Sequence, residues 1–254
     1  MSKRLNNKVA VVTGAASGIG EAVVRLFVAE GARVIMTDLN AVEGERIAAE
    51  LGNQVVFMTQ DVADSASWAA LADLVRERFQ RLDVLVNNAG ILLSGNIEEA
   101  TLEQWQKLLR VNADSAFLGC QTAIRLMKVS GGGGSIINIS SIAALAARDD
   151  YMAYGASKGA VAAMTRSVAV HCRKQKYRIR CNSVHPDGVL TAMTRASYPQ
   201  GVDPARFTID SDPMNRACLP QDVASAVLYL ASDESRAVNG IELRVDSGQF
   251  VMSI

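Results

Sequence analysis

The sequence predicts a single α/β domain of the doubly wound, Rossmann type, with helices on both faces of a seven-stranded parallel sheet. Short runs rich in valine and isoleucine alternate with helix-length segments along the whole chain, which is typical of repeated βαβ units. The runs are almost continuously apolar, as expected for strands that are covered on both faces. No repeat or shift in composition divides the chain, so we expect residues 1–254 to form one domain.

The apolar runs are expected to be the strands, at Val9–Thr13, Arg33–Asp38, Val55–Gln60, Val84–Asn87, Ile136–Ser140, Ile179–Val184 and Ile241–Val245. Among the segments between them, the clearest helices are expected at Glu21–Glu30, Ser65–Gln80, Leu102–Met127 and Ser157–Gln175. The glycine run at 131–134 is expected to form a loop before the fifth strand, because consecutive glycines interrupt regular structure.

The composition is that of a globular protein without net charge. Of the 254 residues 49% are hydrophobic, and 26 basic side chains balance 26 acidic ones. This balance gives no electrostatic reason to expect nucleic acid or a membrane as a partner. No apolar run approaches the roughly 18–20 residues that span a bilayer, and the amino terminus has no signal-peptide core, so we expect a cytoplasmic protein. His171 and His185 have no metal-ligand spacing and the four cysteines include no CxxC pair, so neither a metal site nor a disulfide framework is predicted.

A glycine-rich turn follows the first expected strand and leads directly into a helix. Glycines allow a tight turn and let the backbone approach a pyrophosphate, and the helix N-terminus offers free N–H groups. Such a turn is weak evidence alone, but its place between a strand and a helix predicts a dinucleotide site. The candidate cofactor-binding residues of this turn are Gly14, Ser17, Gly18, Ile19 and Gly20.

Asp38 ends the second expected strand, at close to the spacing of about 20 residues that is typical of a ribose-binding acid. Its carboxylate could accept hydrogen bonds from both adenosine ribose hydroxyls and would repel a 2′-phosphate, and Leu39 supplies no cation there. The sequence therefore favours NAD over NADP as the cofactor. The alternative, in which Asp38 only caps the following helix, stays open.

Two further strand ends offer residues to the nucleotide. Asp61 and Val62 end the third strand, where an acid and an apolar side chain could bracket the adenine. The small residues Asn88, Ala89 and Gly90 end the fourth, where they would let the nucleotide lie against the strand. These five residues are candidate cofactor contacts, because ligands of open α/β sheets bind at the carboxyl ends of the strands.

Tyr154 and Lys158 form a YxxxK pair on an expected helix. Four residues are about one helical turn, so both side chains point from one face. A phenol with a pKa near ~10 is a poor proton donor or acceptor at neutral pH, but an ammonium beside it favours the phenolate and lowers that pKa. We therefore expect Tyr154 to act as a general acid/base on an alcohol or ketone. The alternative is an exposed tyrosine above an exposed lysine.

Together these motifs resemble the short-chain dehydrogenase/reductase family over essentially the whole chain. The matching elements, in order, are Thr13–Gly20, Asp38, Asp61, Asn88–Gly90, Asn112, Ser141, Tyr154, Lys158 and Pro186–Thr191. More narrowly, the sequence is similar to bacterial 3β/17β-hydroxysteroid dehydrogenases in segments such as Asn87-Asn-Ala-Gly-Ile-Leu-Leu and Cys172-Arg-Lys-Gln. The resemblance implies a single NAD-binding dehydrogenase domain, a secondary alcohol or ketone as substrate, and a homotetramer.

The resemblance also implies the roles of four catalytic residues. Ser141 would hydrogen-bond the substrate oxygen, and the adjacent Ser140 should face the other side of the strand. Lys158 would bind the nicotinamide ribose as well as lower the pKa of Tyr154. Asn112 would hold a water of a proton relay, unless it is only a polar break in its helix.

The segment after the sixth strand is expected to hold the nicotinamide end of the cofactor. Pro186, Val189 and Thr191 match family positions that contact the cofactor. Asp187 stands where many members of the family have glycine, although the steroid-dehydrogenase resemblance includes an aspartate there. How the backbone meets the nicotinamide carboxamide is therefore open.

Residues 190–218 form a long segment without clear periodicity, which is expected to be the substrate-binding loop. Apolar side chains in this segment and after the cofactor-binding strands could enclose a bulky alcohol such as a 3β/17β-hydroxysteroid, namely Met193, Tyr198, Phe207, Met214, Leu92, Leu93, Ile142 and Leu145. Three alternatives stay open. These side chains could be core or subunit contacts, the substrate could be a polyol, an aromatic diol or a 3-oxoacyl thioester, or the chain could be a non-catalytic NAD-binding regulator. The sequence leaves stereochemistry, physiological direction and the choice between dimer and tetramer open.

Overall fold

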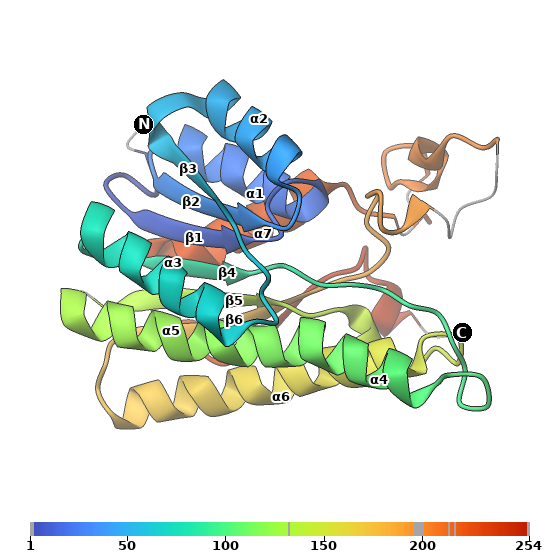
Figure 1. Cartoon of the computed structure of the whole chain (residues 1–254). Coiled ribbons are helices and arrows are strands. Elements are labelled where there is room, and N and C mark those ends of the chain that lie inside the picture. The colour runs from blue at the N-terminus through green and yellow to red at the C-terminus, as the bar shows by residue number, and fades with distance from the viewer. Residues whose placement is uncertain (1–2, 132, 196–200, 213, 216, 253–254) are drawn as a thin grey trace.

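Seven parallel strands form one sheet in the computed structural model of the chain, in the order β3-β2-β1-β4-β5-β6-β7 (Figure 1). The structure describes residues 3–252 except 132, 196–200, 213 and 216. The predicted doubly wound α/β fold is confirmed. The strand order reverses between β1 and β4, and open α/β sheets bind their ligands at the carboxyl ends of the strands beside such a reversal.

The strands follow the predicted runs closely. They are β1 Val9–Thr13, β2 Arg33–Asp38, β3 Val55–Thr59, β4 Val84–Asn87, β5 Gly134–Ile139, β6 Ile179–Pro186 and β7 Glu242–Val245. β5 begins at Gly134, inside the glycine run that was expected to be a loop, because this residue pairs with Ile179 of β6. β6 continues to Pro186, two residues beyond the predicted end, because it pairs with Val245 of β7.

The helices lie in two layers, one on each face of the sheet (Figure 1). They are α1 Gly18–Ala29, α2 Ala41–Leu51, α3 Ser65–Arg78, α4 Leu102–Leu108, α5 Ser115–Ser130, α6 Met152–Lys174 and α7 Pro220–Ala231. One apolar cluster joins the sheet to α1, α2 and α7, and a second joins it to α3, α5 and α6. Among the described residues, no helix is both long and apolar enough to cross a membrane.

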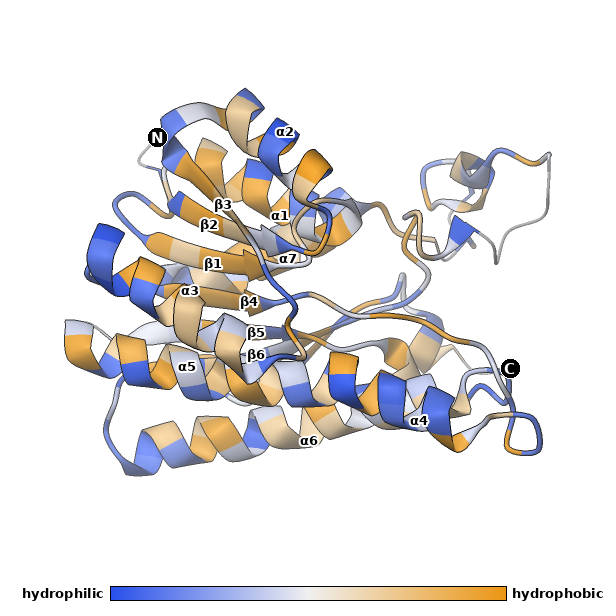
Figure 2. Ribbon diagram, viewed as in Figure 1, coloured by the Kyte–Doolittle hydropathy of each residue, from blue (hydrophilic) through white to orange (hydrophobic). Residues whose placement is uncertain are grey.

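Each strand sends alternate side chains into the two apolar clusters. In β1, Ala10 and Val12 belong to the cluster of α1, α2 and α7, and Val9 and Val11 belong to the other. Figure 2 shows that the inner strands are hydrophobic, whereas the surface helices carry both hydrophobic and hydrophilic residues. A sheet covered on both faces therefore explains why the runs in the sequence are apolar at nearly every position.

The predicted helix Leu102–Met127 is interrupted by one wide turn. α4 ends at Leu108, residues Leu109–Asp114 form a π-helical segment, and α5 begins at Ser115. Asn112 lies in the wide segment and is only 2% exposed. Such π segments occur frequently at functional sites, because they rotate one side chain out of the regular α-helical register.

The segment 190–218 leaves the carboxyl end of the sheet and returns to it. Val189 pairs with Cys218 at its base, Thr208 pairs with Ala217 further out, and a short 3₁₀ helix spans Pro204–Phe207. Figure 1 shows the described part of this segment standing off the body of the molecule. Tyr198, which was predicted to contribute to the substrate site, lies outside the described residues.

Candidate active site

A cleft of about 590 Å³ opens at the carboxyl ends of the strands, where the strand order reverses. The turn before α1, the ends of β2 to β6 and the first residues of the segment 190–218 all contribute to its walls. Every predicted catalytic or cofactor-binding residue lines this cleft except Gly20 and Asn112. The motifs and the family resemblance together therefore identified a set of residues that the fold brings together from positions up to 177 residues apart, between Gly14 and Thr191.

Gly20 lies behind the wall of the cleft and not in it. A Cβ atom on Gly20 would lie 2.1 Å from the carbonyl oxygen of Gly14 and 2.6 Å from Nδ2 of Asn88. Its role is therefore to let the first turn of α1 pack directly on the glycine-rich turn.

The glycine-rich turn is held open toward the cleft by the end of β4. Asn88 Nδ2 donates to the carbonyl oxygens of Thr13 at 2.9 Å and Gly14 at 3.0 Å. The Thr13 hydroxyl accepts hydrogen bonds from the backbone N–H groups of Asn88 and Ala89, both at 3.0 Å. Ser17 is the N-cap of α1 but makes no side-chain cap hydrogen bond. The first-turn N–H groups of α1 thus lack a side-chain cap, as a site for a pyrophosphate requires.

Asp38 is held beside this turn by two backbone hydrogen bonds. Its carboxylate accepts from the N–H of Ala16 and from the N–H of Asn40, both at 2.9 Å. The residue that caps α2 is Asn40, whose side chain accepts from the N–H of Glu43. Asp38 is therefore not the helix cap that the alternative interpretation required. Leu39 lines the cleft beside it with 70% of its surface exposed.

Gln60 is a residue of the cleft that the sequence analysis did not identify. It follows β3 and is only 2% exposed, yet neither its Nε2 nor its Oε1 has a hydrogen-bond partner among the described residues. Leaving both atoms of a buried amide unpaired is costly, so a bound polar ligand would stabilise this side chain. With the open turn before α1 and the carboxylate of Asp38, the unpaired amide fits the adenosine half of a dinucleotide.

Ser140 and Ser141 both follow the end of β5 and both line the cleft, although only one of them was expected to face it, but their hydroxyls have different partners. The Ser140 hydroxyl donates to the carbonyl oxygen of Lys158 at 2.9 Å. The Ser141 hydroxyl accepts from the N–H of Ala143 at 3.1 Å and also hydrogen-bonds the phenol of Tyr154. Of the two serines, Ser141 therefore carries its hydroxyl next to the tyrosine.

The pKa of Tyr154 is raised above 10, so the predicted lowering by Lys158 is wrong for the protein without cofactor. Burial of the phenol disfavours the phenolate and outweighs the hydrogen bond from Ser141, which acts in the opposite direction. The Lys158 ammonium lies 5.8 Å from the centre of the tyrosine ring and donates to the carbonyl oxygen of Ile139 at 2.9 Å. Burial lowers the pKa of Lys158 to about 8, which shows how strongly this position disfavours charge.

Asn112 links the end of β4 to the first turns of α6. Its Oδ1 accepts from the N–H of Ile91 at 2.8 Å, and its Nδ2 donates to the carbonyl of Ile91 and to Ser157 Oγ, both at 3.0 Å. Ser157 Oγ in turn donates to the carbonyl oxygen of Tyr154 at 2.7 Å. A Cβ atom on Gly90 would lie 3.1 Å from Asn112 Oδ1 and 3.3 Å from the Lys158 ammonium. Asn112 therefore positions the tyrosine helix from behind the cleft and is more than a polar break.

His185 positions Ser141, a role that the sequence analysis missed. The side chain is fully buried in β6, with Nδ1 3.0 Å from the carbonyl oxygen of Ser141 and Nε2 2.8 Å from Ser183 Oγ. Burial lowers the pKa of His185, so the imidazole is neutral at physiological pH. Among the described residues, no cluster of three His, Cys, Asp or Glu side chains could hold a metal ion.

Lys107 and Arg110 also line the cleft without having been predicted. They are three residues apart, and residues at this spacing share one face of a helix, so the spacing could have identified them as a pair.

Fewer of the residues predicted to enclose the substrate line the cleft than was expected. Met193 lines the cleft, whereas the predicted Phe207, Met214, Leu92, Leu93, Ile142 and Leu145 are not among its lining residues.

Comparison with known proteins agrees with this geometry. A family model described as Enoyl-(Acyl carrier protein) reductase matches residues 14–249. A 3-beta-hydroxysteroid dehydrogenase of Comamonas testosteroni is 46% identical over 258 residues, which cover 100% of both chains. A 3-alpha-(or 20-beta)-hydroxysteroid dehydrogenase of Mycobacterium tuberculosis is 43% identical over 98% of this chain and 91% of its own. An NADP-dependent (R)-specific alcohol dehydrogenase of Lentilactobacillus kefiri is 41% identical over 98% of both chains. The chain belongs to the short-chain dehydrogenase/reductase family of oxidoreductases.

Proposed function

We propose that the protein is an NAD-dependent oxidoreductase that interconverts a secondary alcohol and a ketone, with 3β- or 17β-hydroxysteroids as the substrate class. One observation carries the proposal. The phenol of Tyr154 hydrogen-bonds Ser141 inside the cleft, one helical turn from the buried ammonium of Lys158. A positioned proton donor beside a hydroxyl donor is what the oxygen of an alcohol or ketone requires.

In alcohol oxidation Tyr154 would take the hydroxyl proton of the substrate while Ser141 donates a hydrogen bond to the same oxygen. When bound, NAD would supply the acceptor for the hydride and, in its oxidised form, a positive charge. Lys158, Asp38 and the glycine-rich turn would hold the dinucleotide. In the opposite direction Tyr154 would return the proton to the ketone oxygen.

The direction of the Tyr154 pKa sets the expected pH dependence. Because burial raises this pKa, the phenol is protonated at neutral pH and is ready to donate to a ketone. Alcohol oxidation needs the phenolate, so we expect its rate to rise with pH across the alkaline range. Ketone reduction should be fastest at neutral pH and fall as the phenol loses its proton.

Asp38 supports the preference for NAD. Its carboxylate faces the cleft at the end of β2, and the adjacent Leu39 adds no cation that could neutralise a 2′-phosphate. One relative is named as NADP-dependent, so the two cofactors should be compared directly in the same assay.

The steroid assignment rests on two relatives named as hydroxysteroid dehydrogenases and on Met193 at the edge of the cleft. A smaller cyclic or open-chain secondary alcohol is the second candidate. Two observations favour it. Among the described members of the predicted apolar enclosure, Met193 alone lines the cleft, and a Cyclopentanol dehydrogenase of Comamonas is 38% identical over 96% of this chain and 98% of its own.

We further propose a homotetramer in the cytoplasm. Phe117 of α5 and Val170 of α6 are 52% and 53% exposed on the outer layer of helices, where a second copy could cover them. Light scattering combined with gel filtration would measure the mass directly, and the mass of a monomer or a dimer would contradict the proposal.

A turnover screen tests the proposed function. Purified protein is incubated with NAD or NADP and a panel that contains 3β- and 17β-hydroxysteroids, cyclopentanol, a short secondary alcohol and a polyol, and absorbance at 340 nm reports the reduced cofactor. We expect NADH formation with the hydroxysteroids. NADH formation with the polyol but with no steroid would remove the steroid assignment, and no turnover with any alcohol would remove the dehydrogenase assignment itself.

A further inference from the structure

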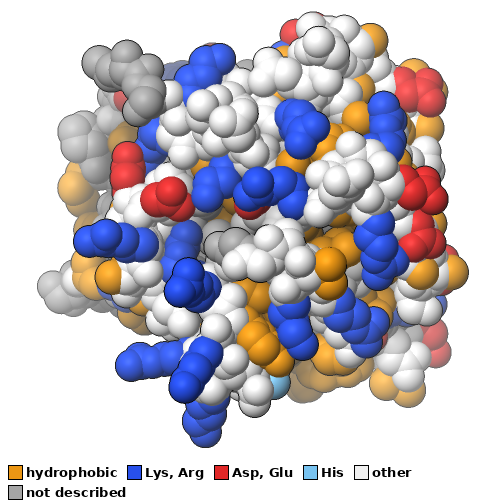
Figure 3. Space-filling view, turned by 90° about the vertical axis from the view of Figure 1, so that its left-hand side faces the viewer, with side chains coloured by type: hydrophobic (Ala, Val, Ile, Leu, Met, Phe, Trp, Pro, Cys, Tyr) orange, Lys and Arg blue, Asp and Glu red, His pale blue; other side chains and the backbone are white. Residues whose placement is uncertain are grey.

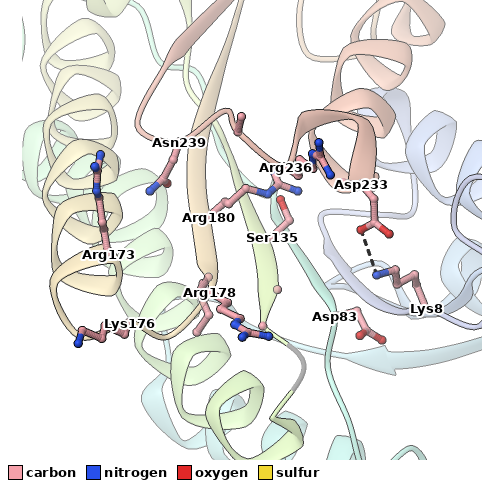
Figure 4. A pocket seen from close by; sticks show the side chains of 15 residues that line it. Lys8, Asp83, Ser135, Arg173, Lys176, Arg178, Arg180, Asp233, Arg236 and Asn239 are labelled. Atoms are coloured by element: carbon pink, nitrogen blue, oxygen red, sulfur yellow. Dashed lines mark hydrogen bonds and ion pairs between the residues drawn. The ribbon is translucent and has the colours of Figure 1, made fainter.

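A second pocket lies at the amino ends of β5 and β6, whereas the active-site cleft lies at the carboxyl ends of the strands. It has a volume of about 600 Å³, nearly that of the cleft. We name it the basic pocket, because its lining includes Lys8, Arg173, Lys176, Arg178, Arg180 and Arg236. Figure 3 shows lysine and arginine side chains gathered over this side of the molecule, and Figure 4 shows the pocket from close by.

The positive charge of the basic pocket is only partly neutralised. Its two acidic side chains are already engaged, since Asp83 pairs with Arg81 and Asp233 lies 3.4 Å from the ammonium of Lys8 (Figure 4). The remaining cations at the rim are exposed and make no ion pair with any described residue. They are Arg173, Lys176, Arg178 and Arg236. The chain as a whole has no net charge, so this gathering is a local feature.

Arg180 adds a guanidinium at the wall of the pocket. Its Nη2 donates to the backbone carbonyls of Leu230 at 2.9 Å and Ser232 at 3.2 Å, whereas Nη1 is buried and has no partner among the described residues. Desolvation lowers the pKa of this arginine and outweighs the opposing attraction of Asp233, so the nearby carboxylate does not fully compensate the burial of the guanidinium. A bound anion would give the charge the partner that it lacks.

The elements that carry these cations are fixed by the sheet. Arg173 lies in the last turn of α6, Lys176 and Arg178 lie in the loop before β6, and Arg236 follows the short 3₁₀ helix after α7. Gly134 donates its N–H to the carbonyl oxygen of Arg178 at 3.2 Å, which ties that loop to the start of β5. The cations therefore come from separate segments that meet around one hollow, which is unlike a solvated stripe of charge along one helix.

We propose that the basic pocket binds a small anion that carries at least two phosphate groups, of the class of a nucleoside polyphosphate or another phosphorylated metabolite. Guanidinium forks match phosphate oxygens in pairs, and one phosphate would leave most of the four unpaired rim cations without a partner. The volume of the pocket accommodates a molecule of about nucleotide size. This site is separate from the cleft and does not depend on the proposed oxidoreductase activity.

Calorimetric titration of the full-length protein with sodium pyrophosphate tests the proposal. The titration is made with and without NAD, because the turn before α1 is also expected to accept phosphates. We expect one site that NAD does not displace. Substituting Arg178→Asn together with Arg236→Gln should weaken that site by at least about tenfold, since each guanidinium contributes a charge-assisted hydrogen bond. Asparagine is chosen at position 178 because the residue has a φ of 56°, which asparagine tolerates.

A matched control removes the same amount of charge outside the pocket. Arg78→Gln with Lys174→Gln neutralises two basic residues in the last turns of α3 and α6 that do not line the pocket, and should leave pyrophosphate affinity within about twofold. The absence of an NAD-independent site, or unchanged affinity in the pocket variant, would overturn the proposal. Equal weakening in both variants would also overturn it, because a diffuse basic surface and not a pocket would then be responsible. Binding of duplex nucleic acid without binding of pyrophosphate would likewise rule out a small-molecule site.

Discussion

Replacing the buried Lys158 with methionine should stabilise the protein without cofactor, although it removes a residue of the proposed catalytic set. Lys158 is 4% exposed, and burial lowers its pKa from 10.5 to about 8. This difference corresponds to about 3 kcal/mol of unfavourable free energy for the charged folded form, at about 1.4 kcal/mol per pH unit. Methionine would leave the Ile139 carbonyl without its hydrogen bond from Lys158, at a cost of about 1 kcal/mol. We expect a net gain of about 2 kcal/mol in the free energy of unfolding at pH 7.

The sign of the pH dependence follows from the lowered pKa. Between pH 8 and 10.5 the unfolded chain holds the Lys158 proton and the folded protein has released it, so the wild type gains stability relative to the variant as pH rises. The advantage of Lys158→Met should therefore be constant below pH 8, shrink above it, and disappear before pH 10.5. All other titrating groups are shared, so the difference between the two proteins isolates this lysine.

Urea unfolding followed by circular dichroism measures the difference at pH 7, 8, 9 and 10 and at one protein concentration. The exposed Lys174→Met serves as the control and should change stability by less than about 0.5 kcal/mol at every pH. The reasoning would be refuted if Lys158→Met were less stable than the wild type at pH 7, or if its stability difference did not change with pH.

Three further results are expected. Replacing Asp38 with serine and Leu39 with arginine should shift the ratio of kcat/KM for NAD and NADP toward NADP, since repulsion of the 2′-phosphate becomes attraction, and equal use of both cofactors by the wild type would contradict this account. His185→Phe should lower the free energy of unfolding by about 2 kcal/mol and reduce kcat more than it raises KM, because the backbone of Ser141 loses its hydrogen-bond partner; an unchanged kcat would count against this role. Asn112→Ala should destabilise the protein by about 2 kcal/mol by leaving buried backbone groups unpaired, as thermal or urea unfolding would show.

The fold and most of the cleft could be predicted because their signals are local. Continuous apolar runs mark strands that are covered on both faces, and Asp38 is found by its spacing from the glycine-rich turn. Tyr154 and Lys158 share a helix face because they are one turn apart. Such relations need only the periodicity of one element and the rule that parallel strands end at the same edge.

The remainder of the site depends on tertiary packing, which spacing does not encode. The wide turn at Asn112 places its side chain in hydrogen bonds with the backbone of Ile91, a contact between distant segments of the chain. The raised pKa of Tyr154 depends on how deeply the fold buries the phenol. Gln60 becomes notable only when its amide is seen to be buried without a partner. The basic pocket is lined by both Arg178 and Arg236, which the fold brings to one hollow although the two are far apart in the sequence.

The most direct test of the proposed function compares wild-type protein with Tyr154→Phe. NADH formation from a 3β- or 17β-hydroxysteroid gives the turnover, and quenching of protein fluorescence gives the affinity for NAD. We expect turnover to fall by about 100-fold or more, because the proton acceptor is lost, while the affinity for NAD stays within about threefold because the ring is retained. Tyr177 does not line the cleft, so Tyr177→Phe controls for the loss of one phenol and should keep full turnover. A Tyr154→Phe variant that retained more than about a tenth of wild-type turnover would contradict the role given to this tyrosine.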